Sequence, residues 1–287
     1  MNTFTRFFVA LLAIGIPTAA FADNPLKCWA GKGSETQKLN GFVLNVRPVA
    51  SKIVDPEDAS CRATVTSPTG ATIFSTTDFA FGISRETGRP ISNEHAPDAV
   101  FEAWSGGAPC CLTYWIVSLG KNPGLAARIP ATRYNVSFKD LAHNGQTEIL
   151  TRDGAFGAFD DLCDACSPAP LVILRLKGRK LRFVGAEFWS LYQADISAAR
   201  KEITATERSQ FRNQDKTMDY ATLERAKEAV LQTVLSFLYA DRDSQAWKAL
   251  NEMWPPSDRA RIQAEILKTL PYGFPANPGN PGFAPEQ

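Results

Sequence analysis

The sequence predicts an α+β protein in which an antiparallel β region is followed by a helical subdomain. Upstream of about residue 187, short runs of β-branched and aromatic residues alternate with clusters of Gly, Pro, Asn and Asp, which is the pattern of strands and turns. Downstream, Ala, Glu, Arg, Lys and Leu dominate, and apolar residues recur every three or four positions, as on helices. The predicted parts are a leader at 1–22, a β-rich repeat domain at 23–186, a helical subdomain at 187–270 and a disordered tail at 271–287.

The first 22 residues have the pattern of a secretory signal peptide. Arg6 precedes an apolar run at residues 7–16, and the Ala-Phe-Ala sequence at residues 20–22 offers a small-residue cleavage site. The run covers about ten residues, whereas an anchored helix needs about 20 to cross a bilayer. We therefore expect cleavage and no integral membrane segment. A lipoprotein attached through Cys28 is the alternative, although the charged Lys27 stands where a small residue is wanted.

The balance of charge excludes two classes of partner. The 287 residues include 31 basic and 30 acidic ones, and removal of the leader takes away Arg6 and leaves 30 of each. Nucleic acids demand a basic surface, and electrostatic adhesion to membranes demands basic clusters, so we expect neither. We expect a periplasmic or secreted protein whose partner is another envelope protein or a glycan.

The β region contains an internal repeat. Residues 95–101 form a turn and a strand, and residues 114–119 form a second strand; about 50 residues later, residues 145–151 and 171–176 repeat this order. Each copy contains an acidic residue before its first strand and a long loop with two cysteines before its second. Such periods belong to sheet units that stack on one another. Two earlier strands are predicted at residues 41–46 and 61–66.

Three segments of the repeat carry a resemblance to a known family. Residues 105–111 with the strand after them, residues 140–148, and the Asp-Gly-Ala-Phe sequence at 153–156 resemble the FG-GAP/VCBS repeat of exported bacterial proteins of uncharacterised function. The resemblance covers about residues 85–185. It implies two propeller-blade-like β units and no known activity. Two copies are too few to close a propeller, so closure would come from the N-terminal strands, the helices or a different arrangement.

Four helices are predicted after the β region. The clearest is Tyr220–Tyr239, which has either Thr217 or Asp219 as its cap. The others are residues 187–211, 244–253 and 257–270, with prolines ending the last two. The apolar stripes of the last two helices either pack inside the fold or form a partner-binding groove; they consist of Trp247, Leu250, Trp254, Ile262, Ile266 and Leu267. The tail from residue 271 has little to bury, and we expect it to be disordered or loosely extended.

The family resemblance raises calcium as a ligand, because its repeats usually carry an aspartate-rich loop. Calcium needs several oxygen ligands at alternating loop positions. Asp140, Asn144 and Glu148 hold the first, fifth and ninth positions, but the third is Ala142. The other copy has Pro90, Ser92, Glu94 and Asp98 there. We therefore expect no metal or other cofactor, and instead solvated turns in which Asp140 accepts hydrogen bonds from nearby backbone amides.

All six cysteines follow the leader, and their even number suits disulfides in an oxidising compartment. They are Cys28, Cys61, Cys110, Cys111, Cys163 and Cys166. Our hypothesis is that one or two bridges join the 110/111 pair to the 163/166 pair and that Cys28 pairs with Cys61. A bridge within Cys110-Cys111 ranks lower, because it closes a strained ring. Zinc held by four clustered sulfurs is a further alternative.

Two features bear on catalysis. Cys163 and Cys166 have the two-residue spacing of thiol oxidoreductases, but the Ser-Pro-Ala-Pro sequence at 167–170 obstructs the helix that would stabilise a thiolate. The two histidines, His95 and His143, fall in predicted turns, and neither lies in a recognisable hydrolase motif.

Aromatic residues offer a candidate binding platform. Trp104, Tyr114 and Trp115 are the candidate binding residues, with Phe156 and Phe159 nearby in the other copy. Strand alternation sends Tyr114 and Trp115 to opposite faces of their sheet, so one belongs to the core and the helices could cover the other. Packing is the alternative to binding for all of them.

These observations favour a non-catalytic, exported, disulfide-stabilised binding or interaction module of the cell envelope. The alternative is an extracytoplasmic enzyme. It would be either a thiol–disulfide oxidoreductase using Cys163 and Cys166 or a hydrolase whose residues the sequence does not identify.

Overall fold

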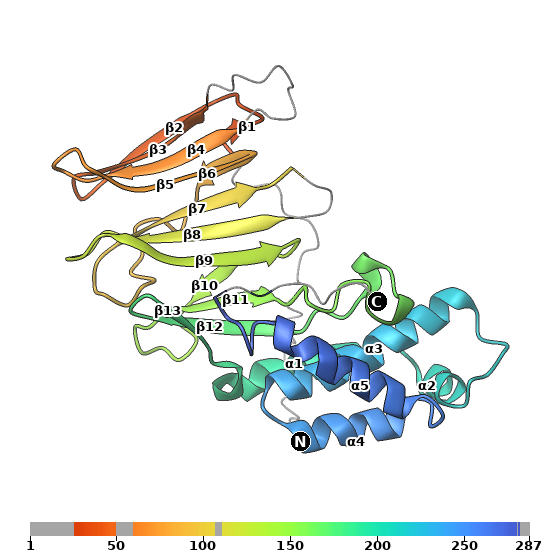
Figure 1. Ribbon diagram of the computed structural model, residues 1–287. Coiled ribbons are helices and arrows are strands. Elements are labelled where there is room, and N and C mark those ends of the chain that lie inside the picture. Colours follow the sequence, from red (N-terminus) through yellow and green to blue (C-terminus); the bar gives the residue numbers. More distant parts are fainter. Residues whose placement is uncertain (1–25, 50–59, 107–110, 280, 282–287) are drawn as a thin grey trace, which may run out of the picture.

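The computed structural model describes residues 26–49, 60–106, 111–279 and 281. It confirms a mixed α+β fold in which three antiparallel sheets lie one on another and five α-helices follow them (Figure 1). The predicted leader and Cys110 lie outside the described residues. Within the described ranges, no helix is both long and apolar enough to cross a membrane.

Each sheet contains four strands that pair in chain order, and β1 extends the middle sheet beside β6. The first sheet consists of β2 (Glu35–Leu39), β3 (Phe42–Pro48), β4 (Cys61–Thr66) and β5 (Thr72–Asp78). The middle sheet consists of β1 (Cys28–Trp29), β6 (Ala80–Ile83), β7 (Asp98–Trp104), β8 (Leu112–Ser118) and β9 (Gly124–Thr132). The third sheet consists of β10 (Ser137–Lys139), β11 (Glu148–Arg152), β12 (Leu171–Lys177) and β13 (Lys180–Phe183).

The strands of the predicted repeat occupy corresponding positions in two sheets. The first copy supplies β7 and β8, which are the second and third strands of the run β6–β9. The second copy supplies β11 and β12, which are the second and third strands of β10–β13. β3 and β4, which match the two predicted strands at residues 41–46 and 61–66, hold the same places in the first sheet.

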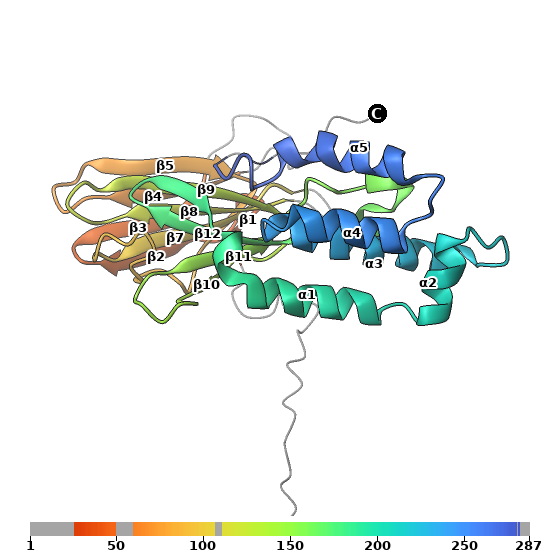
Figure 2. The ribbon, with the colours of Figure 1, turned by 90° about the horizontal axis from the view of Figure 1, so that it is seen from below.

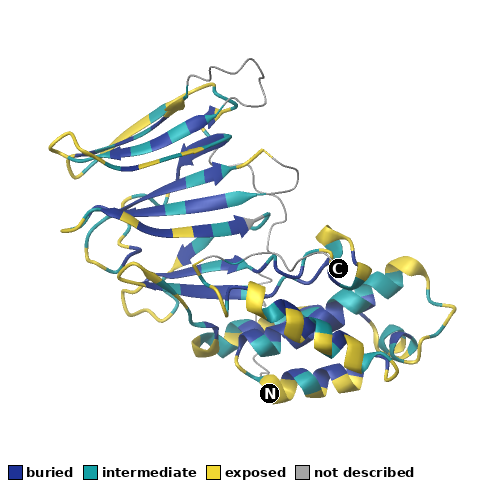
Figure 3. Cartoon of the chain, viewed as in Figure 1, coloured by how far each residue is buried: buried dark blue, intermediate teal, exposed yellow. Residues whose placement is uncertain are grey.

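The middle sheet is apolar on both faces because it is covered on both sides. Phe101 and Val117 belong to the core shared with the first sheet, where Phe101 stacks on Phe74 with ring centroids 5.8 Å apart. Val100 and Ile116, one position away on the same strands, belong to the core shared with the third sheet and the helices. Figure 3 shows these strands as buried. Alternation along β7 and β8 thus sends apolar side chains into two cores at once.

Asn93 joins the middle sheet to the third. It lies in the loop before β7, and its side-chain amide donates to the backbone oxygen of Leu176 at 2.9 Å. Its side-chain oxygen accepts from the backbone amide of Thr147 at 3.2 Å. Asn93 adopts a φ of 59°, and asparagine tolerates that left-handed conformation better than most residues. One turn residue therefore fixes the spacing of two sheets.

The helices share one core with the third sheet and lie on the side away from the first sheet (Figures 1 and 2). They are α1 (Trp189–Lys201), α2 (Ala205–Arg212), α3 (Tyr220–Tyr239), α4 (Asp243–Met253) and α5 (Arg259–Thr269). Single 3₁₀ turns precede α1 and follow α5, at Gly185–Phe188 and Leu270–Tyr272. Among the predicted stripe residues, Leu250, Trp254, Ile262 and Ile266 are buried, whereas Leu267 is exposed. Most of this stripe therefore packs inside the fold.

Two helix predictions are settled by capping geometry. The single helix predicted at residues 187–211 is wrong, because α1 ends at Lys201 and α2 starts afresh behind Thr204. Thr204 and Glu207 form a reciprocal capping box, in which each side chain accepts from the other residue's backbone amide, at 3.1 and 2.7 Å. The cap of α3 is Asp219, which accepts from the backbone amide of Thr222 at 3.0 Å.

The predicted disorder of residues 271–287 is wrong for residues 271–279, which the structure describes. Phe274 is 1% exposed and belongs to the core that joins the third sheet to the helices. Its backbone amide donates to the buried carboxylate of Asp153 at 2.7 Å. Proline and glycine prevent regular secondary structure here, but one large apolar side chain is enough to dock the segment.

Candidate functional site

The pairing of Cys28 with Cys61 is confirmed. Cys28 lies on β1 of the middle sheet and Cys61 opens β4 of the first, so the bond joins two sheets. Both cysteines are 0% exposed. This disulfide therefore fixes the short strand β1, which pairs with β6 through only two residues.

The proposed bridges between residues 110/111 and residues 163/166 are wrong, because Cys163 and Cys166 bond to each other. Their bond closes part of the loop between β11 and β12, around the 3₁₀ turn Asp164–Cys166. Cys111 is also disulfide-bonded, and the described residues contain no free cysteine. Disulfides persist in oxidising compartments, so these bonds fit a protein that works outside the cytoplasm.

The side-chain oxygens of the calcium candidates form hydrogen bonds or ion pairs within the protein. Asp140 accepts from the backbone amides of Asn144 and Gly145 at 3.0 and 2.8 Å, as expected for a closed turn. Glu148 is not a solvated turn residue, since it is 0% exposed and its carboxylate pairs with Arg175 at 2.8 Å. In the described ranges no group of three or more His, Cys, Asp or Glu side chains is placed to hold a metal ion.

The two histidines lie at exposed turns. His95 and His143 have φ angles of 55° and 53°, which place both in the left-handed region. They stand in corresponding loops, before β7 and before β11 respectively. Both histidines are therefore polar residues in exposed turns, as the sequence predicted.

The structure separates the three aromatic binding candidates. Tyr114 and Trp115 point to opposite faces of the middle sheet, as predicted: Tyr114 packs against Phe138 of the third sheet, and Trp115 against Phe74 of the first. Tyr114 is 4% exposed. Neighbouring sheets, rather than helices, cover both residues. Trp104, the last residue of β7 in the same sheet, takes part in neither contact.

Trp104 belongs to an aromatic patch formed with Trp29 and Phe79. The indoles of Trp29 and Trp104 stack with centroids 4.5 Å apart and planes inclined by 21°. Phe79 meets both edge-on, at 5.9 Å from Trp29 and 5.5 Å from Trp104. Trp29 is 48% exposed, the largest exposure of any tryptophan among the described residues. The patch therefore offers an exposed indole whose position is fixed by two other rings.

Strand register creates this patch. Trp29 of β1 and Trp104 of β7 are both the cross-strand partners of Ala80, which lies between them on β6. Directly paired residues point to the same face of a sheet, so the two indoles stand on either side of a methyl group. Ala80 leaves room for the rings to meet above it, and a large side chain there would separate them.

Gly106 allows the chain to turn closely past the patch. It has a φ of 95°, and a Cβ atom built on it would lie 3.2 Å from the Phe79 ring. The sequence pattern identified Trp104 but missed Trp29 and Phe79. The only hint in the sequence that Trp29 belongs to a site was its position directly after Cys28. Its contact with Trp104 depends on strand pairing between residues far apart in the chain.

A polar pocket of about 450 Å³ lies between α1, α3 and the loop that holds Cys163 and Cys166. Inside it, Arg152 forms two hydrogen bonds with Asp195 at 2.8 and 3.2 Å, and Gln232 donates to Asp195 at 2.8 Å. At its rim, burial and the neighbouring charge of Glu202 raise the pKa of Glu228. The interior groups satisfy one another, so this network braces α1 against α3 and the third sheet. No local pattern in the sequence predicted this network.

Comparison with protein-family models, curated proteins and solved structures found no match to this chain.

Proposed function

We propose that this protein is an exported, non-catalytic binding module of the cell envelope and that the aromatic patch is its contact surface. The observation that carries this proposal is the half-exposed indole of Trp29, stacked on Trp104 and fixed by the Cys28–Cys61 bond. Tryptophan is the residue type most enriched at the energetic centres of interfaces. A ring that is already immobilised loses little conformational entropy on binding.

The partner we propose is another envelope protein or a glycan. A flat aromatic surface binds apolar side chains, and it also binds the C–H faces of sugar rings. Lys27 and Lys32 are exposed on either side of Trp29 in the sequence, and they supply hydrogen-bond donors around the apolar centre. This combination of an aromatic centre and a polar rim is typical of binding surfaces.

We propose a periplasmic or secreted location for the module. Support comes from the leader pattern of residues 1–22 and from the disulfides. Fractionation of cells producing the full chain tests this: the leader should be absent from the mature N-terminus, and the thiols should be oxidised. Intact leader and free thiols in the cytosol would contradict it.

Affinity capture tests the binding function. Immobilised mature protein is incubated with bacterial envelope extract, retained proteins are identified by mass spectrometry, and retained glycans by sugar analysis. We expect a reproducible partner that Trp29→Ala loses. Tyr220→Ala is the matched control, because Tyr220 is a 70% exposed aromatic residue on α3, away from the patch. Retention that is equal in both variants would contradict the role of the patch.

A thiol–disulfide oxidoreductase is the second candidate function, and the exposure of Cys163 favours it. The Cys163 sulfur accepts a hydrogen bond from the backbone amide of Cys166 at 3.0 Å, an arrangement that would favour a thiolate. Against it, the motif lies in a loop between antiparallel strands, with a 3₁₀ turn of three residues in place of a helix. Reduction of insulin by dithiothreitol, with and without the protein, separates the two functions. Acceleration that Cys163→Ser abolishes would establish the enzyme.

We also propose that the sheets are blade-like repeat units of the FG-GAP/VCBS type. The support is the chain-order pairing of four strands in each sheet and the matching places of β7 with β11 and β8 with β12. A crystal structure tests this: β6–β9 and β10–β13 should superpose strand for strand. Sheets with different strand orders would contradict it.

A further inference from the structure

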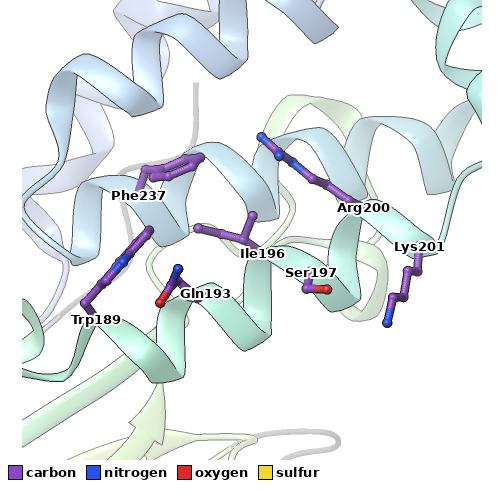
Figure 4. A pocket seen from close by; sticks show the side chains of 7 residues that line it. All are labelled: Trp189, Gln193, Ile196, Ser197, Arg200, Lys201 and Phe237. Carbon is purple, nitrogen blue, oxygen red and sulfur yellow. The ribbon is translucent and has the colours of Figure 1, made fainter.

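A groove of about 390 Å³ runs between α1 and α3, apart from the aromatic patch (Figure 4). Its walls come from Trp189, Gln193, Ile196, Ser197 and Arg200 on α1 and from Phe237 on α3. This volume lies within the range of about 300–1,000 Å³ typical of small-molecule sites. Its size therefore suits a small molecule.

The groove has an apolar end. The rings of Trp189 and Phe237 stack with centroids 5.8 Å apart, and both remain partly exposed. The side chain of Ile196 extends toward them in Figure 4 and forms the apolar base. Trp189 and Ile196 are seven residues apart, which places them on one face of the helix.

The other end of the groove is basic. Arg200 lies on the same face of α1, eleven residues after Trp189, so its Cα lies roughly 16 Å farther along the helix, although its side chain reaches back toward Phe237 in Figure 4. Its guanidinium lies 5.9 Å from the Phe237 ring. Lys201 adds a charge at the rim, although Figure 4 shows it directed away from the rings. A third cation, Arg242, lies over Trp189 at 4.0 Å.

These cations lack acidic partners in the part of the chain that the structure describes. No Asp or Glu side chain lines the groove, and neither Arg200 nor Lys201 takes part in an ion pair there, although twelve ion pairs form elsewhere. Basic residues are favourable in the last turn of a helix, which accounts for their sign. It does not account for the two partly exposed aromatic rings that line the same groove.

We propose that this groove binds a linear amphipathic anion, a monocarboxylate with an unbranched alkyl chain. The chain lies over Ile196 against the rings of Trp189 and Phe237, and the carboxylate accepts hydrogen bonds from the guanidinium of Arg200. We infer a negatively charged ligand because Arg200 and Lys201 line the groove and no Asp or Glu side chain does. The order of apolar and basic side chains along α1 selects a linear molecule with one charged end. This site shares no residue with the aromatic patch, so either proposal can fail alone.

Calorimetric titration of the mature protein tests the proposal, with decanoate and 1-decanol as probes of equal chain length. We expect one saturable decanoate site, and binding of 1-decanol at least about tenfold weaker, because a hydrogen bond between two charged groups is roughly twice as strong as one between neutral groups. Arg200→Gln should weaken decanoate binding about tenfold and leave 1-decanol binding unchanged. Arg182→Gln, which changes an exposed arginine on β13, should alter neither.

Trp189→Ala should weaken the binding of both probes, because it removes the apolar wall. Circular dichroism of each variant checks that the helices are intact. Absence of saturable decanoate binding would overturn the proposal. Equal affinity for the two probes, or an unchanged affinity in Arg200→Gln, would overturn it as well.

Discussion

The backbone amide of Phe274 and the hydroxyl of Tyr239 both donate to one carboxylate oxygen of Asp153, each at 2.7 Å. Asp153 is 1% exposed and follows β11, so this oxygen joins the third sheet, α3 and the C-terminal segment. Burial raises the pKa of Asp153, and the hydrogen bonds from Tyr239, Ala155 and Phe274 oppose that effect. The C-terminal segment is thus part of the folded core.

Phe274→Ala should destabilise the protein by about 3 kcal/mol, since truncation of a buried phenylalanine costs about 3–5 kcal/mol. Tyr272→Ala changes a neighbouring ring that is 37% exposed, and it should cost less than about 1 kcal/mol. Urea unfolding followed by tryptophan fluorescence measures both free energies. Equal costs would show that residues 271–279 do not dock as described.

The Cys28–Cys61 and Cys163–Cys166 disulfides should differ in their contribution to stability. Chain-entropy reasoning gives about 4 kcal/mol for the bond between Cys28 and Cys61, 33 residues apart, and about 2 kcal/mol for the bond between Cys163 and Cys166, three residues apart. The paired variants Cys28→Ala/Cys61→Ala and Cys163→Ala/Cys166→Ala test this by urea unfolding. A smaller loss for the long-range pair would contradict its bracing role.

The same two bonds should react differently with mild reductant. Cys163 is exposed, whereas Cys28 and Cys61 are 0% exposed, and thiol exchange requires access to a sulfur. Alkylation and peptide mapping over time should therefore show Cys163 and Cys166 labelled first. Earlier labelling of Cys61 would mean that β1 opens readily.

Asp98 should make the protein less stable as the pH rises. Burial raises its pKa to about 6, while the hydrogen bonds from the backbone amide and hydroxyl of Ser92, at 2.6 and 2.8 Å, partly oppose this. A raised pKa means that the folded state favours the protonated acid. The stabilisation is complete below the ordinary pKa of 3.8 and is lost as the pH rises through about 6, at a total cost of about 3 kcal/mol.

Asp98→Asn tests this, because asparagine can accept from the Ser92 amide and donate to the Ser92 hydroxyl. Relative to the wild type, the variant should gain on the order of 2 kcal/mol between about pH 4.5 and pH 7.5. Asp140→Asn is the opposite control: hydrogen bonding from Gly145 lowers the pKa of Asp140, so its stabilisation is present at neutral pH and lost in acid. Parallel pH profiles for both variants would contradict the assignment.

Local patterns in the sequence were sufficient to predict much of the fold. Apolar spacing, with either Thr217 or Asp219 as the cap, predicted α3 with its observed bounds, Tyr220–Tyr239. The matching order of β7–β8 and β11–β12 was also readable, because each strand alternates and each loop carries turn residues. The break before α2 was missed, because apolar residues continue at helical spacing across it. Thr204 and Glu207, three residues apart, were the local signal for a capping box.

The candidate sites depend on relationships that no local pattern contains. Trp29 meets Trp104 only because both pair with Ala80 across β6. The alternation rule predicted opposite faces for Tyr114 and Trp115, but it could not show that a sheet covers each face. The bond between Cys163 and Cys166 was not among the predicted pairings, because the expectation that the two cysteine-bearing loops are neighbours favoured a bridge between them.

If the aromatic patch is the binding surface, the bound partner must cover Trp29. Hydroxyl-radical footprinting compares the oxidation rates of Trp29 and Tyr220 in the mature protein, alone and bound to the partner retained from envelope extract. We expect bound Trp29 to oxidise several-fold more slowly while the oxidation rate of Tyr220 is unchanged. Oxidation of Trp29 at the same rate in both states would contradict the assignment of the aromatic patch as the binding surface.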